Sequence, residues 1–193
     1  MNNSEKITND PSLIDYFSQE HPSPLIVELA ERGDINGNVL DINCGTGNDA
    51  LYLSALGYSS LGIDDSIDDL KVAKQTAELM LVRRGTCARF KPGNPLHLDR
   101  LNEKFNTILD QHDFLRFSPE EQKEYAESIT KVTQPGGVIL IVVRPKGIYT
   151  TNTSIENYLI KLFGSNWIAI RNECYPSKDG DFMYIMLQNG QGS

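Results

Sequence analysis

Short apolar runs alternate along the chain with longer segments in which apolar residues recur at helical spacing. Runs such as 39–42 and 60–63 fit buried strands, and the segment 48–56 between them presents one apolar helical face. The pattern predicts strands at 39–42, 60–63, 86–90, 105–110, 138–143, 167–175 and 182–187, and helices at 12–17, 25–32, 48–56, 67–84, 119–133 and 154–163. Such alternation is typical of an α/β protein.

The last three predicted strands indicate how the sheet ends. The run 138–143 is apolar on both faces, as expected for a strand in the middle of a helix-covered sheet. Segments 167–175 and 182–187 are predicted to pair as a hairpin across the polar stretch 176–181. We therefore expect seven strands, the last of them antiparallel.

The segment 38–65 is predicted to form a βαβ unit with a glycine-rich first turn. In Asn43-Cys44-Gly45-Thr46-Gly47 the glycines let the backbone bend or let a ligand come close. Free N–H groups in this turn and at the start of the next helix favour an anionic or polar ligand. Asp64 lies about 17 residues past Gly47, near the spacing of a carboxylate that accepts ribose hydroxyls. The unit therefore predicts binding of an adenosine-containing cofactor.

These residues leave two cofactor classes open. One is a dinucleotide, because Gly45-Thr46-Gly47-Asn48-Asp49-Ala50 matches the G-x-G-x-x-A fingerprint. The other is S-adenosylmethionine (SAM). The stretch VLDINCGTGNDALYL…GIDDS closely resembles the first two motifs of class I SAM-dependent methyltransferases, whose usual form is VLD-x-G-C-G-T-G. Asp41 belongs to that pattern and not to the dinucleotide one.

The resemblance covers about 24–187 and includes the turn Gln134-Pro135-Gly136-Gly137. It implies a Rossmann-like seven-stranded sheet of order 3-2-1-4-5-7-6, with strand 7 antiparallel and helices on both faces. The nearest branch is the thiopurine-methyltransferase-like group, which acts on small molecules. We expect a single domain at 12–189 after a mobile tail at 1–11.

The resemblance also implies where the cofactor binds. Asn43 stands where the family has glycine, and asparagine tolerates left-handed backbone angles, so the turn is expected to form. Asn94 stands at the acidic position of the family's G-D-A element, where its amide oxygen can accept a hydrogen bond from adenine. Pro92-Gly93-Asn94-Pro95 is equally typical of an ordinary turn. The predicted cofactor-binding residues are Asp41, Asn43, Cys44, Gly45, Thr46, Gly47, Asp64, Asp65, Asn94, Pro95, Asp110 and Gln111.

The chain that leaves the fourth predicted strand carries the candidates for catalysis. In related enzymes this segment lines the pocket around the transferred methyl group. His112 is a candidate general base for a hydroxyl or thiol, with Asp113 to orient it; the alternative is a surface histidine. We expect no metal site, since C-x-x-C is absent and the three histidines are scattered. The predicted substrate-binding residues are Tyr16, His112, Phe114, Arg144 and Tyr149.

Composition bears on the partner and the compartment. The net charge of -8 repels phosphate backbones, which argues against a nucleic-acid or anionic-membrane partner. The polar start MNNSEKITND lacks the apolar region of a signal peptide, and no apolar run reaches membrane-spanning length. Three scattered cysteines fit free thiols in a reducing cytosol. These features predict a cytoplasmic protein with a small-molecule partner and leave the oligomeric state open.

The leading prediction is a SAM-dependent methyltransferase that acts on a small-molecule acceptor. Because the methyl group of SAM is already activated, alignment of the nucleophile supplies much of the catalysis, worth ~7–11 kcal/mol in favourable cases. Asn43, Asn94 and Asn106 depart from the family pattern and leave open a catalytically degenerate binding or regulatory protein. A nicotinamide-dependent oxidoreductase is a third alternative, opposed by the short chain and the Pro-Gly-Gly turn.

Overall fold

The computed structural model describes residues 21–84, 88–111, 114–144, 152–177 and 180–190, without the side chains of 81–84 and 152–153. Two compact units divide the chain, a first unit at Met1–Gly93 and a second unit at Asn94–Ser193. The predicted tail at 1–11 and the predicted helix at 12–17 lie outside the described residues. The single domain at 12–189 stays a prediction.

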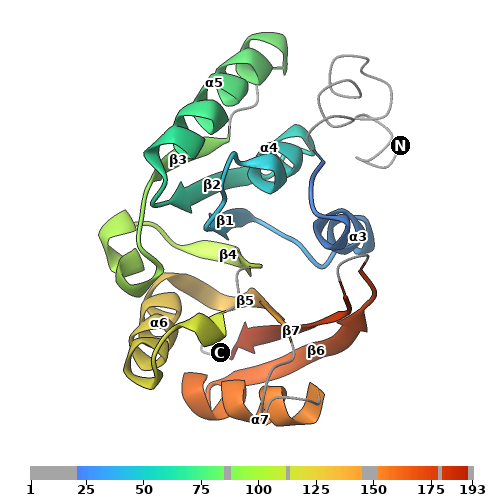
Figure 1. Cartoon of the computed structure of the whole chain (residues 1–193), viewed down its shortest axis with the longest axis vertical. Helices are drawn as coiled ribbons and strands as arrows, with labels where there is room; N and C mark the ends of the chain where they lie inside the picture. Colours follow the sequence, from blue (N-terminus) through green and yellow to red (C-terminus); the bar gives the residue numbers. More distant parts are fainter. Residues whose placement is uncertain (1–20, 85–87, 112–113, 145–151, 178–179, 191–193) are drawn as a thin grey trace. The chain divides into compact units, whose positions relative to one another are not determined.

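Within the described residues, seven strands form one sheet in the order β3-β2-β1-β4-β5-β7-β6 (Figure 1). The strand pairs β1–β2, β2–β3 and β4–β5 are parallel, whereas β7 is antiparallel to both β5 and β6. The predicted Rossmann-like order and the antiparallel seventh strand are confirmed. The strands are β1 (Asn38–Ile42), β2 (Ser59–Asp64), β3 (Arg89–Pro92), β4 (Phe105–Asp110), β5 (Thr133–Val143), β6 (Trp167–Tyr175) and β7 (Phe182–Asn189).

In the described part of the first unit, the helices α3 (Pro24–Arg32), α4 (Asn48–Ala55) and α5 (Ile67–Arg84) accompany the strands. Helix α3 has Pro24 in its first turn and ends at Gly33, whose φ of 78° is left-handed. Helix α4 packs on β1 and β2, and α5 packs on β2 and β3. Every residue of α4 from Ala50 to Ala55 is buried, so this helix is a fixed support for the turn that precedes it.

The second unit contains the 3-10 helices η1 (Pro95–Leu101) and η2 (Phe114–Arg116), and the α-helices α6 (Pro119–Val132) and α7 (Asn152–Phe163). Helix α6 starts with a capping box. The Ser118 hydroxyl accepts the Glu121 N–H at 3.3 Å, and the Glu121 carboxylate accepts the Ser118 N–H at 2.8 Å. The predicted start of this helix is therefore confirmed. Its buried face carries Tyr125, Ile129 and Val132.

Two strands begin three or more residues away from their predicted start, whereas the other strand boundaries differ by at most two residues. Strand β5 begins at Thr133 and not at 138, because Phe105 of β4 pairs with Thr133 and Thr107 pairs with Val138. The Pro-Gly-Gly turn is thus a bulge inside the strand, and its Gly136 takes a left-handed φ of 74°. Strand β3 begins at Arg89, since its pairing with β2 runs from Arg89 to Pro92.

Candidate functional site

The turn between β1 and α4 has three residues in the left-handed region. These are Asn43 (φ 53°), Gly45 (φ 54°) and Gly47 (φ 84°). Left-handed angles are uncommon outside glycine, and asparagine is among the residues enriched there. The prediction that Asn43 still allows the turn to form is confirmed. The turn closes on itself through the Gly47 N–H, which donates to the Cys44 carbonyl at 2.8 Å.

Phe90 of β3 packs directly beneath this turn. A Cβ atom on Gly47 would lie 2.5 Å from the Phe90 ring, and one on Gly62 of β2 would lie 2.6 Å from it. The Gly62 position would also meet the Cys44 sulfur at 2.7 Å. By contrast, a Cβ on Gly45 would meet no described atom within 4 Å. The turn is therefore packed tightly on its inner side and has open space at Gly45.

Asp64 ties the end of β2 to the glycine turn. Its Oδ2 atom accepts the Gly45 N–H and its Oδ1 atom accepts the Ser66 N–H, each at 2.8 Å. The side chain is 8% exposed. A carboxylate offers about four lone-pair positions, so these two bonds leave room for two further donors. Two hydroxyls of a ligand are donors of the required kind. The neighbouring Asp65 is exposed.

The carboxylate of Asp41 lies next to the turn, and the thiol of Cys44 belongs to the turn itself. Asp41 is buried at the end of β1, and Cys44 is half-buried. Burial raises the pKa of the Cys44 thiol far above its usual range, and the nearby Asp41 and Asp64 carboxylates raise it further. Cys44 is therefore a neutral thiol and a poor nucleophile. Thr46 is half-buried in the same turn.

Asn94 opens the second unit and is exposed. Its Oδ1 atom accepts the Leu96 N–H at 2.9 Å and so caps η1, while Pro95 is buried at the first position of that helix. The ordinary turn role of this segment is thus observed. The amide oxygen of Asn94 has a second lone pair that can still accept a hydrogen bond from adenine. That adenine contact stays a prediction.

The end of β4 places a buried carboxylate against a tyrosine that sequence reasoning did not single out as functional. The Tyr125 hydroxyl donates to Oδ2 of Asp110 at 2.5 Å. Burial raises the pKa of Tyr125 well above its usual range, and the Asp110 carboxylate adds to the effect, so the phenol stays protonated. Gln111 is half-buried, and Phe114 is buried against the rings of Tyr125 and Tyr158. In the sequence, Tyr125 shows only as one inward position of a helix.

Of the other predicted substrate and catalytic residues, Arg144 alone lies within the described part of the chain. Tyr16, His112, Asp113 and Tyr149 lie outside the described residues. Arg144 is described and exposed, with its guanidinium carbon 5.9 Å from the centroid of the Phe182 ring. In the part of the chain that the structure describes, His, Cys, Asp and Glu side chains form no cluster of three that could hold a metal ion.

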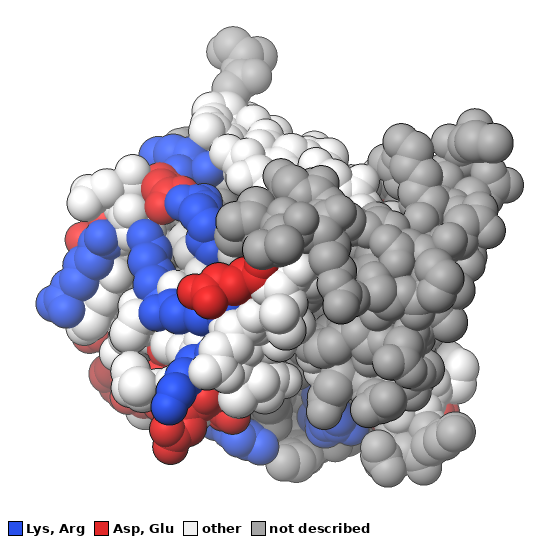
Figure 2. Space-filling model, turned by 90° about the horizontal axis from the view of Figure 1, so that it is seen from above, with Lys and Arg blue, Asp and Glu red and all other residues white. Residues whose placement is uncertain are grey.

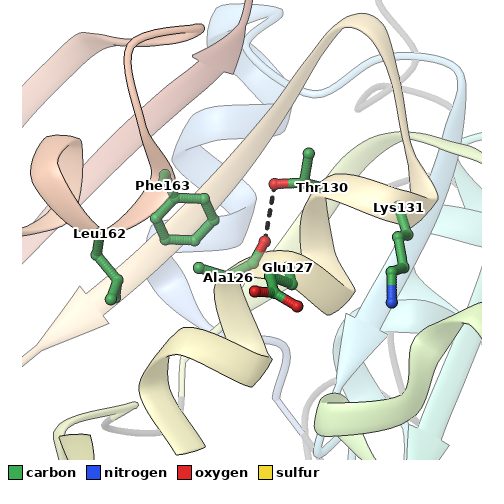
Figure 3. Close-up of a pocket in the computed structure, with 6 residues that line it drawn as sticks. All are labelled: Ala126, Glu127, Thr130, Lys131, Leu162 and Phe163. Atoms are coloured by element: carbon green, nitrogen blue, oxygen red, sulfur yellow. Dashed lines mark hydrogen bonds between the residues drawn. The ribbon is translucent and has the colours of Figure 1, made fainter. Parts of the chain in front are cut away.

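A pocket of about 370 Å³ lies between α6 and α7 (Figure 3). Glu127 and Lys131 are exposed, and the Thr130 hydroxyl donates to the Ala126 carbonyl at 2.7 Å. This pocket contains none of the predicted site residues and no buried polar group free to orient a ligand, so we do not identify it with the active site. It is lined by Ala126, Glu127, Thr130, Lys131, Leu162 and Phe163.

The surface seen in Figure 2 carries charges of both signs. Lys and Arg side chains lie among Asp and Glu side chains on the described part of this face. The expectation that nucleic acid is not a partner stays a prediction.

Among the described helices, none is both long and apolar enough to cross a membrane.

Comparison with known proteins decides the family. Residues 39–137 match the family model described as "Methyltransferase domain", and this match spans β1, the glycine turn and the Pro-Gly-Gly bulge. The chain belongs to the methyltransferase domain family. Membership favours the predicted class I methyltransferase over the nicotinamide-dependent alternative.

Similar proteins agree with this family. This chain is 30% identical over 134 residues to 2-heptyl-1-hydroxyquinolin-4(1H)-one methyltransferase of Mycobacteroides abscessus, covering 69% of this chain and 57% of that protein. It is 28% identical to probable thiol methyltransferase 2 of Arabidopsis thaliana over 129 residues, covering 64% of this chain and 54% of that protein. The chain thus spans little more than half of these curated relatives.

A solved structure titled "Conversion of a Disulfide Bond into a Thioacetal Group during Echinomycin Biosynthesis" has the same fold. Its TM-score is 0.72 at 25% identity, with 89% of this chain and 84% of that chain covered. Magnesium protoporphyrin IX methyltransferase from Synechocystis PCC 6803, solved with bound SAM, gives a TM-score of 0.68 at 17% identity, with 97% and 89% covered. The second likeness concerns the fold alone.

Proposed function

We propose that this protein is a class I SAM-dependent methyltransferase that transfers the cofactor's methyl group to a small-molecule acceptor. The observation that carries the proposal is the glycine turn of a methyltransferase-family chain, held to the end of β2 by the Asp64 carboxylate. A small-molecule acceptor agrees with the two curated relatives, whose names specify a hydroxyquinolinone and a thiol.

The residues of the turn fit the nucleoside and sulfonium parts of SAM. Asp64 has lone pairs left for the two ribose hydroxyls, while its other lone pairs are held by Gly45 and Ser66. Open space at Gly45 lets a ligand approach the backbone, because no described atom would meet a Cβ there. The neutral Cys44 thiol does not compete as a methyl acceptor. Asp65, Asn94, Pro95, Asp110 and Gln111 complete the proposed cofactor-binding set with Asp41, Asn43, Thr46 and Gly47.

We propose an oxygen or sulfur atom as the acceptor. The N-hydroxyl group named in one relative and the thiol named in the other are both groups that lose a proton more readily than an alkyl alcohol. Their anions are nucleophiles once a methyl donor is aligned with them, so the protein needs little acid–base machinery. His112 as general base, Asp113 as its orienting partner, and Tyr16, Phe114, Arg144 and Tyr149 as acceptor contacts remain part of the proposal.

When bound, SAM supplies a methyl group on a positively charged sulfur. This charge is dispersed as the methyl leaves, so a poorly hydrated site favours transfer. The tight packing of Phe90 against Gly47 and Gly62 leaves no room for a further atom on the inner side of the turn. The protein's own contribution is therefore to hold the cofactor, exclude water and align the acceptor. We place this enzyme in the cytoplasm as part of the proposal.

The test is a screen for S-adenosylhomocysteine release from SAM with small thiols and N-hydroxyquinolinones as acceptors. We expect turnover with at least one of these classes, and methylated product in equal amount. Calorimetric titration with SAM accompanies the screen. SAM binding without turnover would favour the catalytically degenerate alternative, and an absence of heat at millimolar SAM would remove the cofactor assignment.

A further inference from the structure

Tyr125 contacts both ends of the segment that leaves β4. Its hydroxyl donates to Asp110, the last residue of β4, at 2.5 Å. Its ring stacks on Phe114, the first residue of η2, with centroids 6.1 Å apart and an interplanar angle of 28°. Asp110 and Phe114 bracket Gln111 and the two candidate catalytic positions. One side chain of α6 thus holds the chain on both sides of these positions.

The surroundings of Tyr125 fix its own position. It is 0% exposed, and its ring lies 5.7 Å from the Phe117 ring and 6.3 Å from the Phe163 ring. Phe117 directly follows η2 and Phe163 is the last residue of α7, so Tyr125 is enclosed by residues of the same unit. A side chain packed in this way has little rotational freedom and can serve as a rigid reference.

A second set of contacts ties η2 to the same helices. Phe114 also stacks on Tyr158 of α7, with centroids 6.4 Å apart. The Tyr158 hydroxyl donates to the Gln122 side-chain oxygen, and the Gln122 amide donates to the Phe117 carbonyl at 2.9 Å. The segment after β4 is therefore anchored at residues 110, 114 and 117.

The Asp110–Tyr125 pair is costly as a purely structural device. Asp110 is 1% exposed, and a buried carboxylate loses hydration that only strong hydrogen bonds offset. Replacing both partners of a buried hydrogen bond by apolar groups of the same shape can leave the stability nearly unchanged. The hydrogen bond does, however, fix an orientation, because a short bond to a charged acceptor holds the Asp110 carboxylate in one position.

We propose that Tyr125 is a positioning residue for methyl transfer, acting through Asp110 and Phe114 on the chain at the carboxyl end of β4. Carboxyl ends of strands are where open α/β sheets place their ligands. Tyr125 itself is fully buried and does not touch the reacting groups. The proposal rests on the proposed function, and it assigns Tyr125 to the alignment of the acceptor with a cofactor that Asp110 and Gln111 help to bind.

The test compares Tyr125→Phe with a matched control, Tyr184→Phe. The first variant removes only the hydroxyl on Asp110 and keeps the ring stack. The control removes a hydroxyl that donates to the Glu173 carboxylate at 2.7 Å, also from a 1% exposed tyrosine, but on β7. Both variants undergo amide hydrogen exchange over peptides that cover 110–118, and steady-state kinetics with SAM and the best acceptor from the screen.

For Tyr125→Phe we expect faster exchange at 110–118 and a fall in kcat of ~10–100-fold, since misplacement by about 1 Å can cost ~10²-fold. The KM for SAM should change much less than kcat, because the carboxylate of Asp110 stays in place and what is lost is alignment in the transition state. The control should match the wild type in exchange over 110–118 and in kcat.

A third variant, Phe114→Leu, removes the ring stack and keeps the hydroxyl. It should lower kcat and speed exchange in the same peptides. Because Phe114 is also a proposed acceptor contact, its exchange rate, and not its kcat, serves in place of Tyr125→Phe if that variant does not fold. Unchanged exchange, or faster exchange with an unchanged kcat, would overturn the proposal. Failure of the proposed function is distinguishable, because it appears as absent turnover in the wild type while the exchange comparison still decides whether Tyr125 holds the segment.

Discussion

Replacing Asp64 by alanine tests whether its carboxylate binds the ribose of SAM or serves only to hold the glycine turn. Its two oxygens accept N–H groups of Gly45 and Ser66, each at 2.8 Å, so the carboxylate is fixed before any ligand arrives. In the proposed complex, the remaining lone pairs accept the two ribose hydroxyls. Alanine removes all of these acceptors at once.

The substitution is expected to weaken SAM binding and, separately, to lower the free energy of unfolding. Hydrogen bonds to a charged group contribute about 1.5–3 kcal/mol, which corresponds to a ~10–150-fold weaker Kd for SAM. The Gly45 and Ser66 amides lose their acceptor whether or not SAM is bound, so this part lowers the free energy of unfolding. An amide left without a partner costs at most about 1–3 kcal/mol, less where water reaches it.

The assay is calorimetric titration of SAM into wild type, Asp64→Ala and Asp64→Asn, with thermal unfolding of each protein. Asparagine keeps one acceptor oxygen and should give an intermediate Kd. Asp68→Asn is the control, because Asp68 is exposed in the first turn of α5 and should leave the Kd unchanged. A folded Asp64→Ala protein that binds SAM as tightly as the wild type would refute the assignment of the ribose contact.

Three further predictions concern single residues. Burial and nearby carboxylates raise the pKa of Cys44, so iodoacetamide at pH 8 should modify the exposed Cys174 before Cys44. Labelling of Cys44 should accelerate only at a pH well above the usual pKa range of thiols. Peptide mass spectrometry measures the labelling at both cysteines. Gly47→Ala forces a left-handed alanine against the Phe90 ring and should cost about 1–3 kcal/mol, measured as a lower Tm. Ser118→Ala removes the α6 cap and should lower the urea-derived free energy of unfolding by about 0.5–2 kcal/mol.

The opening βαβ unit can be predicted from the sequence because its signals are local. The apolar run that ends in Ile42, the glycines of the turn and the apolar face of α4 each determine a short piece of structure. Asn43 is the instructive case. Its left-handed angle follows from the chemistry of asparagine, although the family has glycine at that position.

The features that sequence reasoning missed depend on contacts between distant residues. Tyr125 and Asp110 are fifteen positions apart, and nothing in the helix pattern distinguishes this tyrosine from an ordinary core residue. The Pro-Gly-Gly segment carries strong turn signals, yet it is a bulge, because β4 pairs with β5 on both sides of it. Likewise, the Asp64 acceptor role toward Gly45 appears only once β2 lies beside β1.

We propose above that this chain uses SAM to methylate an oxygen or sulfur atom of a small molecule. The most direct measurement incubates the wild-type protein with SAM labelled on its methyl group, together with a thiol or an N-hydroxyquinolinone. We expect labelled acceptor and S-adenosylhomocysteine to form in equal amounts. SAM that remains intact with every acceptor of both classes would contradict it.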